Sequence, residues 1–425
     1  MEREEIVPRP LLQRRCRLDP SGSCAGSEKQ DIAGRLLALD VAEYLRLHAA
    51  CKAWRVCTAD PRAEGGLDSR FRPRNWIAMS HCAPPSRRTL LNVATGAHVD
   101  FPELSTRRHF GSAEGRLVLC DKTSNAIGLL NPLTGVLVEF PAISDVRALT
   151  VPSGAYLITF RASYNLELDS TKVNVPNPPV IKGAGINDST FPSTLVLCLR
   201  KQLSHVVCVK PGDGHWVSVH HGEQRVDSVT ALGRILFQSL LSFRGRCYLT
   251  TPRGDIMTVD LGPMTSHRSP SSLAWEMALG DGVKGMSCLV RSHDDRMLMV
   301  RYSFSRHGDL TVTDGDGNPA KTFISCGAPS RMEESEMYID GRRLIPLRGI
   351  GNNAVFVGDM HSIMLPTGKF PKIAAKTVYM NYLWQRVRRF GAYRFEDGTT
   401  TPPRDLRRDK KGREEGFAPC ACRIG

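Results

Sequence analysis

The fold is decided by residues 90–102, LLNVATGAHVDFP, which align without gaps to residues 129–141, LLNPLTGVLVEFP. The second copy begins 39 residues after the first. Each copy predicts a strand, a tight Asn-x-x-Thr-Gly turn, a second strand and a proline that ends it, because glycine permits the backbone conformation that such a turn needs. The repeat therefore predicts two hairpins of the same design.

A hairpin that returns after roughly 40 residues is typical of β-propellers, in which a four-stranded blade cannot bury both of its faces alone. Outward from the repeat, strand-like runs separated by turn residues continue over residues 75–400. No long helical pattern interrupts them, which argues against a parallel α/β fold. We predict a mainly β chain with a single β-propeller of about six to eight blades over residues 75–400, and a polar loop over residues 165–190.

The N-terminal part has a different pattern. Residues 1–30 mix prolines, glycines and charges without a period, which predicts a disordered leader. From Asp31 to Arg55 there is no proline, and apolar residues recur at helical spacing. We predict a small α-helical segment over residues 31–61 and a linker over residues 62–74.

One apolar stripe defines this helical segment. Its members stand at positions i, i+3, i+7 and i+10, and they are Tyr44, Leu47, Cys51 and Trp54. Asp40 comes just before the stripe and is the expected N-cap, since its carboxylate can accept a hydrogen bond from the first helical turn. The pattern predicts an amphipathic helix from Tyr44 to Trp54.

The net charge of +14 and the pI near 9.3 would suit an anionic partner. The positive residues gather near the two ends of the chain, however, and no basic helix with interleaved aromatic residues occurs. This distribution argues against a nucleic-acid-binding protein. We interpret residues 401–425 as a disordered basic tail, with a nuclear-import signal as the alternative.

The 13 cysteines are an odd number and most of them stand inside apolar, strand-like runs. Such thiols are typical of a reducing compartment. Residues 1–20 lack the apolar core of a secretory signal, and no apolar stretch reaches the roughly 18 residues that a membrane helix needs. We expect a soluble protein of the cytoplasm, the nucleus or both, with no membrane partner.

Motifs for catalysis or metal binding were not found in the sequence. It contains no G-x-S-x-G elbow, no phosphate-binding loop and no H-E-x-x-H zinc motif. Asp314–Asn318 begins like a calcium loop, but Pro319 and Ser325 occupy the positions of the required glycine and glutamate. Strand alternation separates His220 from His215 and His221. We predict no catalytic residue, no cofactor and no metal site.

Residues 50–55, ACKAWR, resemble the end of an F-box, which commonly reads Val-Cys-Lys-x-Trp-Arg. The later chain is similar to plant F-box proteins whose C-terminal part is a KIB-type β-propeller, also called domain of unknown function 295. The matching stretches occur in family order and are Lys210–Trp216, Phe243–Tyr248, Gly351–Asp359 and Phe390–Gly398. Together with the F-box segment, they cover roughly residues 31 to 400.

The resemblance implies that the helical segment binds the SKP-type adaptor of a cullin-based ubiquitin ligase. Such docking depends on a few buried apolar anchors. The anchors expected here are Ile32, Leu36, Tyr44, Leu45 and Trp54. The alternative is that some of them pack the helical segment onto itself. Family F-boxes also open with a Leu-Pro-containing segment, whereas this chain has Cys24–Gln30 at that place.

Three functions are consistent with these patterns. The first is the substrate-recognition subunit of an SCF-type cullin-RING ubiquitin ligase, whose propeller binds an unknown target protein and performs no bond chemistry. The second is a propeller interaction scaffold that has lost adaptor binding, as the atypical residues 24–30 permit. The third is a propeller enzyme, which would need titratable residues that converge in the central channel.

Overall fold

The structure is a computed structural model of the 425-residue chain. It divides into two compact units, Met1–Asp60 and Pro61–Gly425. The leader before residue 26, the tail after residue 399 and the Asp314–Asn318 turn lie outside the described residues. The described ranges are 26–62, 67–73, 75–80, 88–101, 107–143, 180–200, 204–221, 237–251, 254–261, 272–277, 286–292, 294–313, 319–338, 343–347, 349–358, 361–371, 373–384 and 387–399.

The first unit is helical, as predicted for residues 31–61, but its first helix begins at residue 26, inside the stretch that the sequence predicts as a disordered leader. It consists of α1 (Gly26–Leu39), α2 (Val41–Ala50) and α3 (Lys52–Cys57). Asp40 caps α2, because its Oδ1 accepts a hydrogen bond of 2.9 Å from the backbone N–H of Ala42, which confirms the predicted N-cap. None of the described helices is long and apolar enough to cross a membrane.

The prediction of one helix from Tyr44 to Trp54 was wrong in its continuity. Cys51 has an extended backbone, with φ −159° and ψ 167°, and it separates α2 from α3. The segment that follows folds back, since the Tyr44 hydroxyl donates a 2.7 Å hydrogen bond to the carbonyl of Ala59. This long-range contact stabilises a turn that the apolar stripe alone does not indicate.

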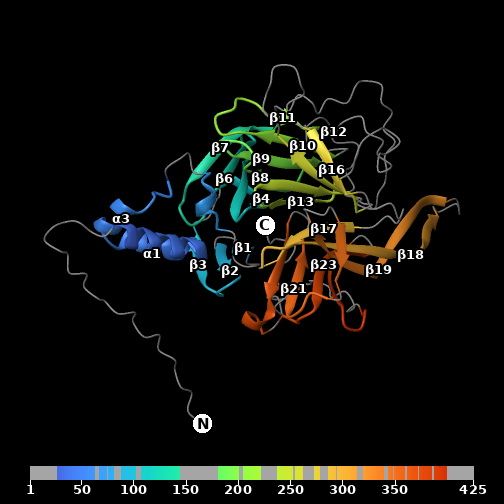
Figure 1. The fold of residues 1–425 in the computed structure, drawn as a ribbon. Coiled ribbons are helices and arrows are strands. Elements are labelled where there is room, and N and C mark those ends of the chain that lie inside the picture. Colours follow the sequence, from blue (N-terminus) through green and yellow to red (C-terminus); the bar gives the residue numbers. More distant parts are fainter. Residues whose placement is uncertain are drawn as a thin grey trace, which may run out of the picture. The chain divides into compact units, whose positions relative to one another are not determined.

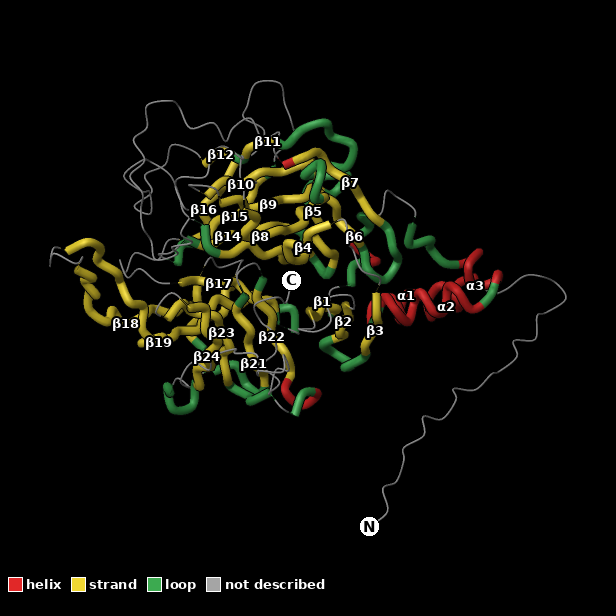
Figure 2. Tube along the Cα trace, turned by 180° about the vertical axis from the view of Figure 1, so that it is seen from behind, coloured by secondary structure: helices red, strands yellow, loops and turns green. Residues whose placement is uncertain are grey.

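The second unit is made of mainly antiparallel sheets that follow one another along the chain, as the colours of Figure 1 and the strands of Figure 2 show. The first sheet contains β1 (Trp76–Ser80), β2 (Arg88–Asn92) and β3 (His98–Phe101). The second contains β4 (Arg107–Ala113), β5 (Arg116–Asp121), β6 (Ala126–Leu130) and β7 (Leu137–Ala142). The third contains β8 (Val180–Asn187), β9 (Thr194–Arg200), β10 (Ser204–Val209) and β11 (Val217–Ser218).

The remaining strands complete three more groups. The fourth sheet contains β13 (Ser239–Phe243), β14 (Arg246–Thr250), β15 (Ile256–Asp260), β16 (Ser272–Met277) and the parallel edge strand β12 (His220–His221). One group of the last sheet contains β17 (Met286–Arg291), β18 (Met297–Thr313), β19 (Pro319–Tyr338) and β20 (Arg343–Pro346). The other contains β22 (Ser362–Pro366), β21 (Asn353–Val357), β23 (Thr377–Trp384) and β24 (Val387–Arg394). A single bridge, Arg291 to Ile363, joins these two groups.

The two repeated hairpins are confirmed. They are β2–β3 and β6–β7. In each turn the asparagine Oδ1 accepts backbone hydrogen bonds from the residues two and three positions later, at 2.9 and 3.1 Å for Asn92 and at 3.1 and 3.3 Å for Asn131. The glycines have φ +77° at Gly96 and +71° at Gly135, a left-handed conformation that glycine adopts without strain.

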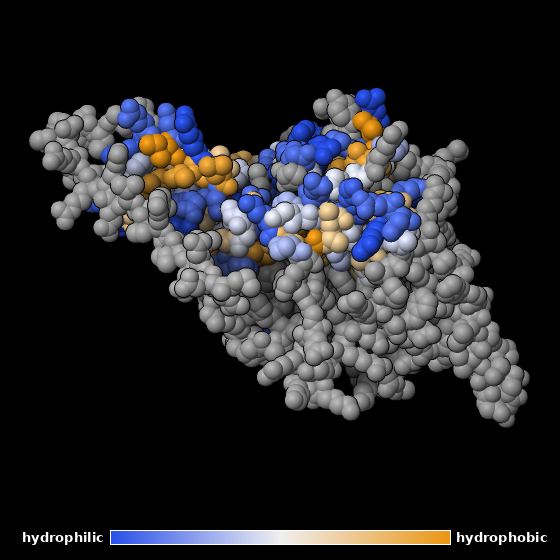
Figure 3. All heavy atoms as spheres, turned by 90° about the horizontal axis from the view of Figure 1, so that it is seen from below, coloured by the Kyte–Doolittle hydropathy of each residue, from blue (hydrophilic) through white to orange (hydrophobic). Residues whose placement is uncertain are grey.

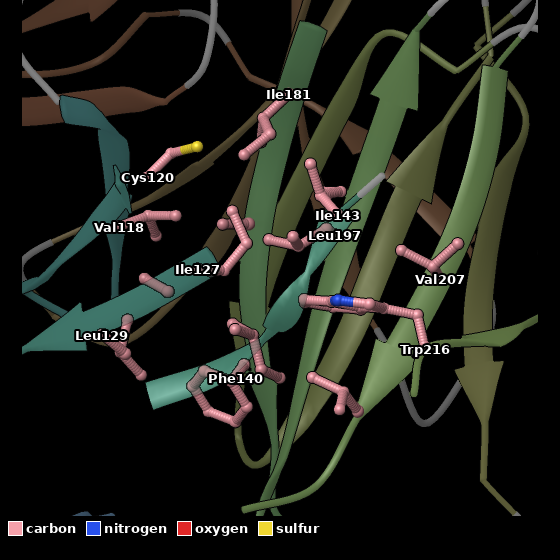
Figure 4. Close-up of a cluster of buried hydrophobic side chains, with 14 of the residues drawn as sticks. Val118, Cys120, Ile127, Leu129, Phe140, Ile143, Ile181, Leu197, Val207 and Trp216 are labelled. Atoms are coloured by element: carbon pink, nitrogen blue, oxygen red, sulfur yellow. The ribbon is translucent and has the colours of Figure 1, made fainter. Parts of the chain in front are cut away.

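Hydrophobic clusters join successive sheets from the second sheet onward. Figure 4 shows the first of them, in which Ile127 and Phe140 from the second sheet face Leu197 of β9 and Trp216, which follows β10. Further clusters link the third sheet to the fourth, the fourth to the β17 group, and the β17 group to the β22 group. In the last cluster, Ile77 and Leu91 of the first sheet pack with Phe356 of β21.

Because the last strands share a core with the first, the six groups of described strands close on themselves as blades do. This is the mainly β, propeller-type architecture that the sequence predicts, and the number of described groups agrees with the lower end of the predicted blade count.

Part of the predicted loop over residues 165–190 is a buried strand, β8, so that prediction was wrong for residues 180–187. The strand packs against β13 of the following sheet. A Cβ at Gly185 would lie 2.5 Å from Leu240 Cδ2 and 2.8 Å from Ser242 Oγ, and one at Gly183 would lie 2.8 Å from Leu240 Cβ. Gly183 and Gly185 suit this strand because they let it approach β13 closely.

Candidate functional site

The turns that follow β4, β8, β13 and β17 meet at one place, which we call the turn face and define as residues 114–115, 188–193, 244–246, 291–292 and 294–296. The backbone N–H of Asp188 donates a 2.7 Å hydrogen bond to the carbonyl of Gly245, which ties the second turn to the third. Arg291 Nη1 lies 3.6 Å from Glu114 Oε2, which connects the fourth turn to the first. Charged residues of distant sequence position are therefore neighbours.

Tight turns explain why charges occur here. Glu114, Arg244 and Asp295 have positive φ angles of 52°, 46° and 57°, and glycine follows the first two. Such turns match the twist of the strands they connect and point their side chains to solvent or to neighbouring turns. Each of these three turns therefore carries a charged residue at the turn face.

A buried ion pair anchors the segment before β1 to the turn face. Arg72 donates two hydrogen bonds to Asp188, from Nη1 to Oδ2 at 2.7 Å and from Nη2 to Oδ1. The Arg72 side chain is 1% exposed, against 24% for Asp188. Residues 67–73, which the sequence predicts as linker, also bury Leu67 and Phe71 in the β unit.

Beside this pair lies a second buried guanidinium. Arg116 is 1% exposed, and its Nη2 donates a 3.1 Å hydrogen bond to the carbonyl of Asp68. Within the described part of the chain, its Nε and Nη1 have no hydrogen-bond partner. Burial, together with the nearby charge of Arg72, lowers the pKa of Arg116 to about 9, although Asp188, Asp68 and Glu114 oppose this change. Arg116 therefore stays charged at neutral pH, although hydrogen bonds within the described residues satisfy only one of its three guanidinium nitrogens.

A looser network covers the opposite side of the turn face. Arg291 Nη2 donates a 2.5 Å hydrogen bond to Asp295 Oδ1, and Arg244 Nε lies 3.6 Å from Asp295 Oδ2. Both guanidinium groups stack on the ring of Phe243, at 5.2 Å for Arg244 and 5.7 Å for Arg291. Half-exposed pairs of this kind are weak and can exchange partners.

The chemistry of this site suits the binding of carboxylates. Its cations are guanidinium groups, which hold their protons at neutral pH and serve as donors for carboxylates. Burial lowers the pKa of His361, while the Glu114 carboxylate partly offsets that change. Among the residues that the structure describes, no group of three His, Cys, Asp or Glu side chains could hold a metal ion.

The expected adaptor-binding residues fall into three environments. Tyr44 is 2% exposed and stacks on His48 at 6.3 Å, so within the helical unit it packs α2 against the following segment. Leu36, Leu45 and Trp54 are partly buried, and Lys29 Nζ lies 5.8 Å from the Trp54 ring centre. Ile32 is 48% exposed. The unit thus brings the five residues into one small domain without placing them all on its surface.

The helical unit exposes further apolar residues that sequence reasoning did not select. Leu39 is 74% and Val56 is 78% exposed. In the space-filling view, hydrophobic side chains lie among hydrophilic ones at the left, the side on which Figure 1 draws the helices (Figure 3). Leu39 and Val56 lie at helix ends, outside the stripe from Tyr44 to Trp54, which explains why the apolar pattern did not identify them.

The geometry can now be compared with known proteins. The sequence profile of the KIB1-4 beta-propeller family matches residues 91–406, most of the chain. The chain belongs to the KIB1-4 β-propeller family. This match confirms the KIB-type propeller that the sequence motifs indicated. No curated protein matches the chain significantly.

Solved structures similar to this family member are distant. The β-propeller domain of Cps50 (Swd1) from Myceliophteria thermophila is 10% identical, with 79% of this chain and 84% of that chain covered, at a TM-score of 0.33. A protein of unknown function from Bacteroides caccae is 9% identical, with 59% and 73% covered, at a TM-score of 0.24.

The residues of the turn face were missed at the level of sequence. Asp188 stands in the stretch predicted as a loop, and Arg72, which pairs with it from outside the turn face, stands in the predicted linker. A weak signal exists in Glu114-Gly115-Arg116 and Arg244-Gly245-Arg246, which are two x-Gly-Arg turns between apolar strands. Only the packing of the sheets shows that these turns meet.

Proposed function

We propose that this protein is the substrate-recognition subunit of a cullin-RING ubiquitin ligase of the SCF type. The helical unit binds an SKP-type adaptor, and the propeller binds the protein to be modified. The chain itself carries out no bond chemistry, since the RING subunit and the ubiquitin-conjugating enzyme supply it. This role requires the cytoplasm or the nucleus, where those partners act.

One observation carries the adaptor-binding part of the proposal. Of six large hydrophobic residues that are exposed in the described chain, three lie in the small helical unit: Ile32, Leu39 and Val56. Exposed apolar side chains on short amphipathic helices are the usual anchors for a helical partner. The resemblance of residues 50–55 to the end of an F-box agrees with this use.

The propeller part of the proposal rests on family membership and on the turn face. Propellers place loops from distant blades next to one another, which suits recognition of a protein surface. A binding function without catalysis also fits the guanidinium-rich chemistry of the turn face.

The test is a pull-down of the purified SKP-type adaptor by the full chain. We expect that Leu45→Asp combined with Trp54→Ala abolishes binding, because a charge and a lost aromatic ring remove two apolar contacts. The matched control is Leu137→Asp, at a residue 37% exposed in the β unit, which should bind normally. Circular dichroism of each variant checks that the sheets remain folded.

Wild-type binding by the double variant would refute the docking model. A second function, a propeller scaffold without ligase coupling, is favoured by two features: the atypical residues 24–30 and the burial of Tyr44 inside its own unit. If the folded wild-type chain fails to bind the adaptor, that second function replaces the first.

A further inference from the structure

The most exposed large hydrophobic residue of the described chain is Phe191, at 91% exposure. It stands in the loop 188–193, which connects β8 to β9 at the turn face. A single exposed apolar residue is common on protein surfaces and needs no function. The structure around Phe191 distinguishes it from such a residue in two respects, the bracing of its loop and the charges beside it.

The loop that carries Phe191 is braced by its own polar groups. Asn187 Oδ1 accepts hydrogen bonds from the N–H of Ser189 at 2.9 Å and from its hydroxyl at 2.6 Å. The Ser193 hydroxyl donates to Asp188 Oδ1 at 2.6 Å, and the Thr190 and Thr194 hydroxyls are 2.7 Å apart. The ring is therefore presented on a fixed support, and little conformational entropy is lost when a partner covers it.

The base of the loop holds two buried guanidinium groups. Arg72 holds Asp188, and the buried Arg116 adds a second cation whose Nε and Nη1 form no hydrogen bond in the described structure. A Cβ at Gly245 would lie 3.3 Å from Asp188 Cβ, so the turn that carries Arg244 approaches the loop closely. The carboxylates of Asp188, Asp68 and Glu114 act on the Arg116 guanidinium, so cations and carboxylates lie together at the base of the loop.

Among the exposed side chains at the rim of the turn face, arginines outnumber carboxylates. Arg244 and Arg296 have side chains that are 60% and 44% exposed, and Arg246 is exposed as well. The exposed carboxylates are those of Asp294 and Asp295, at 42% and 49%. An aromatic anchor surrounded by arginine and a polar rim is the composition of a protein–protein hot spot.

We propose that Phe191 and the arginines of the turn face form a docking surface for an acidic protein segment that offers an apolar pocket or side chain to Phe191. This inference deepens the proposed function. Only the fate of the bound protein, which is ubiquitin ligation, rests on that function. A nucleic acid is the less suitable ligand, because Phe191 is the one aromatic residue among the described residues of the turn face, which therefore lacks a basic stripe with interleaved aromatic rings for base stacking.

The experiment is the selection of a random short-peptide display library on the purified full chain. Affinities of the enriched peptides are then measured by fluorescence anisotropy. We expect acidic peptides with at least one large apolar residue. Phe191→Ala should weaken their binding about tenfold or more, as loss of a hot-spot aromatic does. Arg244→Glu combined with Arg246→Glu should weaken it by a similar factor and reduce its salt dependence.

The matched control is Ile345→Ala, which truncates a side chain 40% exposed on β20 and should leave the affinities unchanged. Enriched peptides that are not acidic, or that bind Phe191→Ala as tightly as the wild type, would overturn the proposal. So would a library that yields no binding peptide. Binding of oligothymidine that is lost in Phe191→Ala would assign the surface to nucleic acid instead.

The adaptor pull-down separates this result from the proposed function. Phe191→Ala should bind the adaptor normally, because the substituted residue belongs to the β unit. If the wild type binds acidic peptides through Phe191 but does not bind the adaptor, the docking surface stands and the ligase function falls. If the wild type binds the adaptor but no acidic peptide, the ligase function stands and the docking surface falls.

Discussion

The helical unit and the β unit differ in how completely each buries its apolar residues. In the helical unit, Val41, Ala42, Tyr44 and Ala33 are buried, while Ile32, Leu39 and Val56 remain exposed. In the β unit, five clusters join neighbouring groups of strands, and many of their members are fully buried. Among the described residues, the β unit covers most of its apolar faces with its own sheets, whereas the much smaller helical unit leaves a larger share of its apolar residues exposed.

This difference shows that similar hydrophobic patterns serve two purposes. In a blade, each apolar face is covered by the next blade of the same chain. In the short helices, the same kind of face is only partly covered by its own unit. Truncation of an apolar side chain should therefore affect stability in one region and binding in the other.

The largest expected difference is between Leu197→Ala and Ile32→Ala. Leu197 is 0% exposed in the cluster that joins the second and third sheets, and its truncation should lower the free energy of unfolding by about 2–5 kcal/mol. Ile32 is 48% exposed, and its truncation should change stability by less than about 0.5 kcal/mol. Urea unfolding followed by tryptophan fluorescence measures both. Equal effects would contradict the distinction between the two units.

A pair of glycine substitutions should have opposite signs. Gly185→Ala places a methyl group 2.9 Å or less from Leu240, Ser242 and Cys247, and this overpacking should cost about 1–3 kcal/mol. Gly34→Ala in α1 meets nothing within 4 Å and should stabilise the helix by about 1 kcal/mol. The thermal midpoint of each variant and its loss of circular dichroism at helix and sheet wavelengths are the measurements. A stable Gly185→Ala variant would show that β8 and β13 can move apart.

The smallest expected effect is a pH dependence of the β unit. Burial lowers the pKa of His361 below its ordinary value of 6.5, so below that pH the unfolded chain binds a proton that the folded chain resists. Stability should be fully present above the unfolded pKa and should fall as the pH drops through it. The urea midpoint at about pH 7.5 and about pH 5.5 measures this change. His361→Gln should show a smaller difference between the two conditions, and an unchanged difference would exclude His361 as its cause.

Local chemistry made several features predictable. Asp40 is an N-cap because a short carboxylate at that position can reach the first turn of α2. The turns at Asn92–Gly96 and Asn131–Gly135 form because Asn, Thr and Gly satisfy and permit the turn backbone without help from elsewhere. Their spacing then indicated blades, and the family match agrees.

Features that depend on contacts between distant residues were not predictable. Gly183 and Gly185 are typical of loops in a sequence, yet they lie in a strand because Leu240 occupies the space of their side chains. Cys51 belongs to an apolar stripe, but the packing of the Tyr44 hydroxyl on Ala59 favours a break between two helices.

The sequence by itself determined the repeated hairpin, the propeller class and the helical nature of the first unit, because these follow from hydrogen bonds and periodicity within a few residues. Only the tertiary structure decided that Arg72 pairs with Asp188 and that Arg116 is buried beside them, at the base of the loop that exposes Phe191. The reason is physical: such a site depends on which turns the closed ring of sheets brings together, and no local pattern encodes that distance.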